Sequence, residues 1–280
     1  MSDLRLFCLS PSGAEEVSLP DMSSLDAITR QLPPGLYTTF RTYDERRRVL
    51  GLHAHLGRLY LPAPGLNIRP AVEETELRQL LDGLLTNYTG EVRLRLVLTG
   101  SGSLYAAIEP LSPLPPAVYE QGVRAVTVRL QRRSPRLKST AFIEHSQAQR
   151  RLLAESGAFE ALMVRRGYIL EGLTSNFFYV QGGMLGTARR GILLGVTRRT
   201  VLRLARQLGL EVAYNPLHLS RLADIDEAFI TSSSRGVVPL VAIDEMTIGN
   251  GWVGEWARSL QAAYQAYVWQ RSEEIACPLD

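Results

Sequence analysis

The sequence predicts a two-domain α+β protein, and three observations support that class. The chain has 280 residues, 45% of them hydrophobic, which suits one globular subunit with a large core. Short segments rich in apolar and β-branched residues recur along it, together with a few amphipathic helical patterns. Four prolines fall within residues 110–116, where they forbid regular structure and favour a stiff, extended connector. We therefore expect a small N-terminal domain at residues 1–109, a connector at 110–118 and a larger domain at 119–280.

The first half of the chain is expected to contain mostly strands. A polar turn at residues 44–47 predicts that the segments on either side of it pair as a hairpin. Glu73 and Glu74 stand in the first turn of the longer helix, where carboxylates complement the helix dipole. The predicted strands are residues 5–9, 36–43, 49–52, 92–98 and 104–108, and the predicted helices are 55–60 and 72–88.

The second half alternates strands with a few helices and contains no internal repeat. Its strands are expected at residues 123–130, 159–164, 168–170, 177–181 and 228–231, and its helices at 144–155, 197–208 and 253–268.

Charge and cysteine content narrow the class of protein. The 31 basic residues nearly balance the 28 acidic ones and are scattered, which favours a solvated surface over a nucleic-acid interface. There is no apolar run of roughly 20 residues and no signal-peptide pattern. Cys8 and Cys277 have no partner at metal or redox spacing, so we expect a cytoplasmic protein. His53 and His55 form a pair without a third ligand nearby, so no metal site is expected.

Lys138 is the only lysine in the chain, since all other basic residues except the histidines are arginines. Arginine stays protonated, and its delocalised nitrogens are poor nucleophiles. A lysine amine can lose its proton and condense with an aldehyde. Lys138 is therefore a candidate for such chemistry, and the alternative is that one lysine survived by chance in a surface loop.

Binding of pyridoxal 5'-phosphate (PLP) requires such a lysine, an acid for the pyridine nitrogen, an anion site and apolar surfaces beside the ring. Glu171 ends a predicted strand before a small-residue turn, and it could serve as the acid or be an ordinary hairpin glutamate. Residues 195–198 open an amphipathic helix, whose N-terminus could bind phosphate or simply be capped by Thr197. A polar cluster at residues 231–236 offers a second, weaker anion site.

Together these segments resemble the class IV aminotransferases, the fold-type IV PLP enzymes. The resemblance runs from about Leu36 to the end and is strongest at residues 137–139, 171–178, 195–198 and 229–239. It implies a small N-terminal α/β domain and a larger domain with a barrel-like sheet. It also implies a homodimer with the active site between the domains and with the proline-rich connector bordering it.

The resemblance implies a role for each matching residue of the cofactor site. Lys138 matches the Schiff-base lysine and Glu171 the partner of the pyridine nitrogen. The remaining cofactor-binding positions are Arg58, Val196, Thr197 and Ser233 for the phosphate, Leu193 beside the ring, and Asn176 at the start of the next strand.

The substrate site is matched less completely. Tyr37 and Arg41 correspond to the active-site strand of the small domain, and the amides of Ser234 and Arg235 correspond to a site for the substrate carboxylate. Many relatives have an acidic residue where Thr38 stands, and the Thr38-Thr39 pair is closer to the deoxychorismate lyases.

Three functions therefore remain open. The first is an aminotransferase that acts on a small amino acid and a 2-oxo acid. The second is a 4-amino-4-deoxychorismate lyase in which Thr38 assists the leaving group. The third is a catalytically silent PLP-fold protein that merely binds a ligand.

Overall fold

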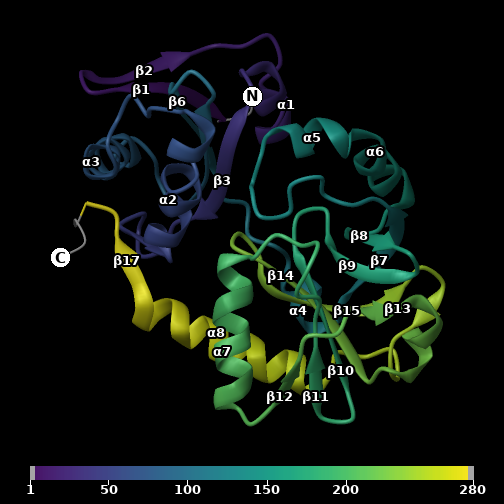
Figure 1. Cartoon of the computed structure of the whole chain (residues 1–280). Coiled ribbons are helices and arrows are strands. Elements are labelled where there is room, and N and C mark those ends of the chain that lie inside the picture. The colour runs from purple at the N-terminus through teal and green to yellow at the C-terminus, as the bar shows by residue number, and fades with distance from the viewer. Residues whose placement is uncertain (1–3, 277–280) are drawn as a thin grey trace. The chain divides into compact units, whose positions relative to one another are not determined.

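The computed structural model describes residues 4–276, and Figure 1 shows its helices and strands. Contacts within the chain divide it into two compact units. The first takes in the described residues up to Ser112, the segment Leu137–Glu144 and the described residues from Val268 onward. The second comprises Pro113–Arg136 and His145–Tyr267. The α+β class predicted from the sequence is confirmed, whereas the predicted domain limits stay a prediction.

The first unit is built on a five-stranded antiparallel sheet in the order β2-β1-β6-β5-β3. A short pair of strands, β4 and β17, lies outside it. Its strands are β1 (Arg5–Ser10), β2 (Gly13–Val17), β3 (Gly35–Arg41), β4 (Arg48–Leu50), β5 (Val92–Thr99), β6 (Leu104–Pro110) and β17 (Ser272–Glu274). Its helices are α1 (Leu25–Gln31), α2 (Leu52–Tyr60), η1 (Pro64–Leu66) and α3 (Glu74–Leu85).

Alternate residues of β3 belong to two different hydrophobic cores. Leu36 and Phe40 pack in the core that also contains the buried leucines of α2 and α3. Tyr37 packs in the core on the other face of the sheet, with Ile28 of α1. Successive side chains of a strand point to opposite faces, so Tyr37 and Thr38 face different surroundings.

The predicted hairpin of residues 36–43 with 49–52 is wrong. Strand β3 pairs along its whole length with β5, and β4 pairs with β17. Between β3 and β4 there is a single bridge, from Tyr43 to Arg48. Asp44, Glu45 and Arg46 all have positive φ, between 54° and 72°, and this left-handed turn takes the chain away from β3.

The second unit contains a ten-stranded sheet, part of which closes on itself. Strands β10, β14, β15, β7, β8 and β9 follow one another, and the pairing of Asn176 with Glu171 joins β9 back to β10. This ring of six strands confirms the barrel-like sheet that the resemblance implied. The strands are β7 (Val123–Arg129), β8 (Glu160–Arg165), β9 (Tyr168–Gly172), β10 (Asn176–Gln181), β11 (Met184–Gly186), β12 (Glu211–Ala213), β13 (Leu217–His218), β14 (Glu227–Ser232), β15 (Gly236–Ile243) and β16 (Met246–Thr247).

The helix predicted at residues 144–155 is interrupted. The structure has α5 (Ala141–His145) and α6 (Gln147–Ser156), separated by the fully buried Ser146 with φ −96° and ψ 9°. The other helices are α4 (Pro116–Glu120), α7 (Val196–Gln207), η2 (Leu219–Asp224) and α8 (Glu255–Arg271). Within residues 4–276, no helix combines the length and apolar character that crossing a membrane would need.

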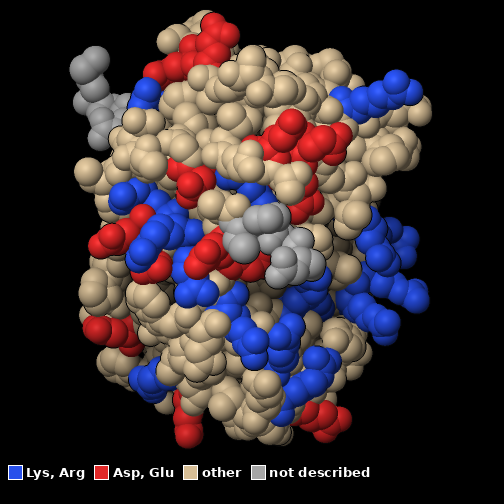
Figure 2. All heavy atoms as spheres, turned by 90° about the vertical axis from the view of Figure 1, so that its left-hand side faces the viewer, with Lys and Arg blue, Asp and Glu red and all other residues tan. Residues whose placement is uncertain are grey.

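Charges of both signs are spread over the surface. On the face drawn in Figure 2, acidic side chains lie among basic ones. This mixture is typical of a solvated surface.

Candidate active site

Lys138 lies in a segment that adds to the free edge of β3. The amide of Tyr37 donates to the carbonyl of Lys138 at 2.8 Å, and the amide of Thr140 donates to the carbonyl of Gly35 at 2.9 Å. The amide of Gly35 in turn donates to the hydroxyl of Thr140 at 2.9 Å. These bonds fix the backbone on both sides of Lys138, so its side chain starts from a defined position beside the strand.

The amine of Lys138 lies against the ring of Tyr37, 4.6 Å from its centroid. The guanidinium of Arg95 contacts the same ring at 4.9 Å. Arg95 donates to Asp26 at 2.6 Å and to Thr39 at 3.0 Å, so the position of its guanidinium is itself fixed. A planar ring that attracts cations thus contacts both groups.

The other predicted residues of this unit lie elsewhere. Thr38 is fully buried, and its hydroxyl lies 2.7 Å from Nδ1 of His55, on the core side of β3. Arg41 stacks on Tyr43 at 4.6 Å, and Arg58 is a half-buried residue of α2. The structure therefore brings Tyr37 and Lys138 together and places Thr38 on the opposite face of β3 from Tyr37, and the catalytic role expected for Thr38 stays a prediction.

Glu171 forms the centre of a second group of residues, in the other unit. Its side chain is 1% exposed and forms an ion pair with Arg132, which is also buried and whose Nε donates to Oε1 at 2.8 Å. Its other oxygen accepts from the amide of Leu193 at 3.1 Å and from the side-chain amide of Asn176 at 3.3 Å. Asn176 also donates to the carbonyl of Leu193 at 2.8 Å. A buried carboxylate needs such compensation, because burial of an unpaired charge is costly.

The first turn of α7 provides donors beside this carboxylate. Gly195 precedes the helix, and no side chain caps its first turn. A Cβ atom at Gly195 would lie 2.2 Å from Oδ1 of Asn176, so a larger residue there would require Asn176 to move. The hydroxyl of Thr197 donates to that of Ser233 at 3.4 Å, which brings the β14–β15 turn to the start of α7. Burial lowers the pKa of the Arg198 guanidinium, which donates to the carbonyl of Ala188 at 2.8 Å.

The side chain of Arg235 is engaged within the protein. Its guanidinium donates to Glu160 at 3.1 Å and to Thr174 at 2.5 Å, and Nε donates to Ser232 at 3.1 Å. The backbone amide of Arg235 also donates within the turn, to the carbonyl of Ser232 at 3.4 Å.

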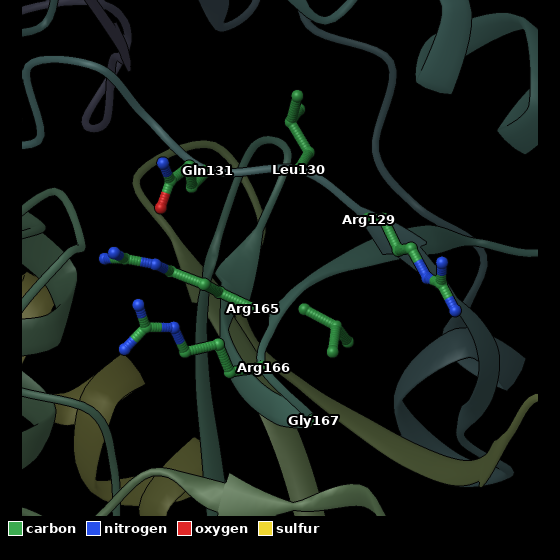
Figure 3. Close-up of a pocket in the computed structure, with 7 residues that line it drawn as sticks. Arg129, Leu130, Gln131, Arg165, Arg166 and Gly167 are labelled. Atoms are coloured by element: carbon green, nitrogen blue, oxygen red, sulfur yellow. The ribbon is translucent and has the colours of Figure 1, made fainter.

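A separate open pocket of about 470 Å³ lies at the ends of β7 and β8. In Figure 3 the side chains of Arg165 and Arg166 extend in the same direction, while Arg129 lies on the opposite side of the pocket. The three guanidinium groups do not converge, and the pocket contains none of the predicted site residues. Its lining consists of Arg129, Leu130, Gln131, Val164, Arg165, Arg166 and Gly167.

Both groups of residues fall within a single family match. The family described as amino-transferase class IV matches residues 35–243, which is most of the chain. The chain belongs to the class IV aminotransferases. The resemblance recognised in the sequence is thereby confirmed, and the chain is an aminotransferase or a related lyase of this family.

Individual relatives of this class IV aminotransferase carry different names. A protein of Methanocaldococcus jannaschii, provisionally named as a branched-chain-amino-acid aminotransferase, is 33% identical over 82% of this chain and 86% of its own. The D-alanine aminotransferase of Bacillus licheniformis is 30% identical over 84% and 88%. The aminodeoxychorismate lyase of Bacillus subtilis is 28% identical over 82% and 84%.

Solved structures agree on the fold. The branched-chain amino acid aminotransferase of T.th. with pyridoxamine 5'-phosphate superposes with a TM-score of 0.77 at 20% identity, covering 97% of this chain and 98% of its own. At this identity the match shows the fold alone.

Sequence reasoning missed several residues of this class IV aminotransferase that contact the predicted ones. Arg132 pairs with Glu171, Glu160 with Arg235, and Arg95 with Asp26 beside Tyr37. Charged residues in otherwise apolar strands, such as Arg95 in β5 and Glu160 at the start of β8, were the available signal. The sequence did not show which partners they would meet.

Proposed function

We propose that this chain is a PLP-dependent aminotransferase that moves an amino group between a small amino acid and a 2-oxo acid. The observation that carries the proposal is the position of Lys138, the only lysine, in a segment held by backbone hydrogen bonds beside Tyr37. A chain that otherwise uses arginine for its cations has here the one side chain that can condense with an aldehyde.

The residues of the second unit fit the remaining parts of PLP. Glu171 is a carboxylate whose buried charge is compensated by Arg132, as a partner of a protonated pyridine nitrogen requires. Uncapped first-turn amides of α7, with the hydroxyls of Thr197 and Ser233, suit a phosphate group. The bound cofactor would supply electron withdrawal from the substrate α-carbon.

Each residue then has a defined task. The amine of Lys138 would hold the cofactor and, once released, would move the proton from the substrate α-carbon to the cofactor carbon that receives the amino group. Glu171 keeps a proton on the pyridine nitrogen. Leu193 flanks the ring, and Arg58 is a further phosphate ligand by its place in the family pattern. The backbone amides of Ser234 and Arg235 bind the substrate carboxylate. We propose that the protein acts as a homodimer, as the family resemblance implies.

The second candidate is an aminodeoxychorismate lyase, which is favoured by the similarity to the Bacillus subtilis protein of that name. Elimination needs a group that assists the departing oxygen. The sequence offered Thr38 for that task, but its hydroxyl is buried against His55, so this chain is the weaker match for elimination.

The deciding experiment adds single amino acids of both hands to the PLP-loaded protein without an acceptor. Release of the matching 2-oxo acid, with conversion to the pyridoxamine form, supports transamination and names the donor. If no amino acid reacts while aminodeoxychorismate yields pyruvate and 4-aminobenzoate, the lyase function replaces the proposed aminotransferase function.

The role of Glu171 has its own test. Glu171→Gln should keep the cofactor and slow proton removal by about a hundredfold. Unchanged turnover would remove Glu171 from the mechanism.

A further inference from the structure

Glu160 is a fully buried carboxylate that takes no part in the mechanism above. It opens β8, and one of its oxygens, Oε2, accepts hydrogen bonds from two different turns, while Oε1 accepts from the amide of Ala161. Thr174 donates at 2.6 Å and Ser175 at 2.9 Å, both from the turn between β9 and β10. Arg235 donates at 3.1 Å from the turn between β14 and β15.

The first of these turns joins Glu171 to Asn176, which form hydrogen bonds to each other and to Leu193. It is shaped around Glu160, because a Cβ atom at Gly172 would lie 2.2 Å from Oγ of Ser175 and 2.9 Å from the carboxyl carbon of Glu160. The carboxylate therefore sets the path of the chain between the two residues expected at the pyridine nitrogen.

The second turn contains the groups expected to bind phosphate and the substrate carboxylate. Arg235 fixes it from within, since its Nε donates to Ser232 at 3.1 Å and its guanidinium also donates to Thr174 at 2.5 Å. The hydroxyl of Tyr119 donates to the carbonyl of Arg235 at 2.9 Å. The guanidinium lies 5.2 Å from the ring of Phe159, so its plane has an aromatic neighbour as well.

We propose that Glu160 and Arg235 are positioning residues that lock both turns in the shape needed to bind the cofactor and the substrate. Arg235 thus acts through its ion pair and not as a cation for the substrate. The link to cofactor binding depends on the proposed function, but the locking of the two turns is a property of the protein without ligand.

The test measures amide hydrogen exchange in the ligand-free protein, in peptides that cover residues 172–176 and 232–236. Glu160→Gln keeps the shape of the side chain and removes its charge, so exchange should accelerate about tenfold in both turns. Arg235→Met should accelerate mainly residues 232–236. In the Arg235→Met background, Glu160→Gln should add little at 232–236 and still loosen 172–176, because the first turn is held through Thr174 and Ser175.

The matched control is Asp244→Asn. Asp244 is another carboxylate of this unit, and it accepts from the amide and hydroxyl of Thr127 at 2.7 Å each. Its φ of 52° suits asparagine. The control should leave the exchange rates of both turns unchanged.

Two outcomes would overturn the proposal. One is a uniform acceleration of exchange across the unit in Glu160→Gln, and the other is no change of exchange in either turn. If Glu160→Gln does not fold, Thr174→Ala and Arg235→Met provide the same comparison.

The second readout is the dissociation constant for PLP, which should rise about tenfold in Glu160→Gln and stay unchanged in the control. Loosened turns without a change in PLP affinity, in a wild type that binds PLP, would contradict the positioning role. A wild type that binds no PLP would instead disprove the proposed function and leave the locking of the turns to be judged by exchange alone.

Discussion

Arg132 and Glu171 form an ion pair in which Nε donates to Oε1 at 2.8 Å, with side chains 4% and 1% exposed. The two residues come from the segment after β7 and from the end of β9. Because both charges are removed from water, each depends on the other for compensation.

Arg132→Met should therefore destabilise the protein by about 3–5 kcal/mol, since it leaves the Glu171 charge buried without its ion-pair partner. Urea unfolding gives the free energy. Adding Glu171→Leu should recover most of the loss, because an apolar pair can replace a buried ion pair. The exposed pair Arg221–Asp224 is the control, and Arg221→Met should cost less than about 1 kcal/mol. Equal losses of stability in Arg132→Met and Arg221→Met would show that the buried ion pair contributes no more than the exposed one.

Lys138→Arg should abolish covalent attachment of PLP, because a guanidinium does not condense with an aldehyde. The wild type should be yellow with PLP, and borohydride reduction followed by peptide mapping should place the cofactor on Lys138. The variant should fold normally, because the carbonyl and amide that pair with β3 are backbone groups. A wild type that stays colourless after incubation with PLP would disprove the central assignment.

Thr38→Val should affect stability and leave turnover near that of the wild type. The substitution keeps the shape of a fully buried side chain and removes its hydrogen bond to Nδ1 of His55, at a cost of about 1–3 kcal/mol. Thermal unfolding and steady-state kinetics check the two parts separately. A large fall in kcat with little loss of stability would return Thr38 to the reacting centre and support the lyase.

Gly195→Ala should weaken PLP binding by about tenfold, because the new Cβ atom would push against Asn176 and disturb its hydrogen bond to Glu171. Backbone strain is not the cause, since φ at Gly195 is −60°. Gly83→Ala in α3 is the control, where a Cβ meets nothing within 4 Å and should stabilise the helix slightly. PLP titration that gives the same affinity for both variants would count against this packing argument.

Several features were predictable because their signals are local. The alternation of apolar residues in β5, the start of α7 after Gly195 and the turn after Glu171 all depend on neighbours in sequence. The identity of Lys138 as the one candidate nucleophilic amine needed only a count of residue types. Predicting these features and recognising the family pattern did not depend on knowing which strands pair.

The sequence by itself thus determined the α+β class, most of the strands and helices and the residues expected at the cofactor. Tertiary structure decided which strands pair with one another and which side chains form ion pairs. Strand β3 pairs with β5 and with the Lys138 segment, not with β4. Arg132 reaches a partner 39 residues away, and Arg235 one 75 residues away. Thr38 lies on the side of α2 because successive residues of a strand alternate between faces, and only the tertiary structure decides which core covers each face of β3.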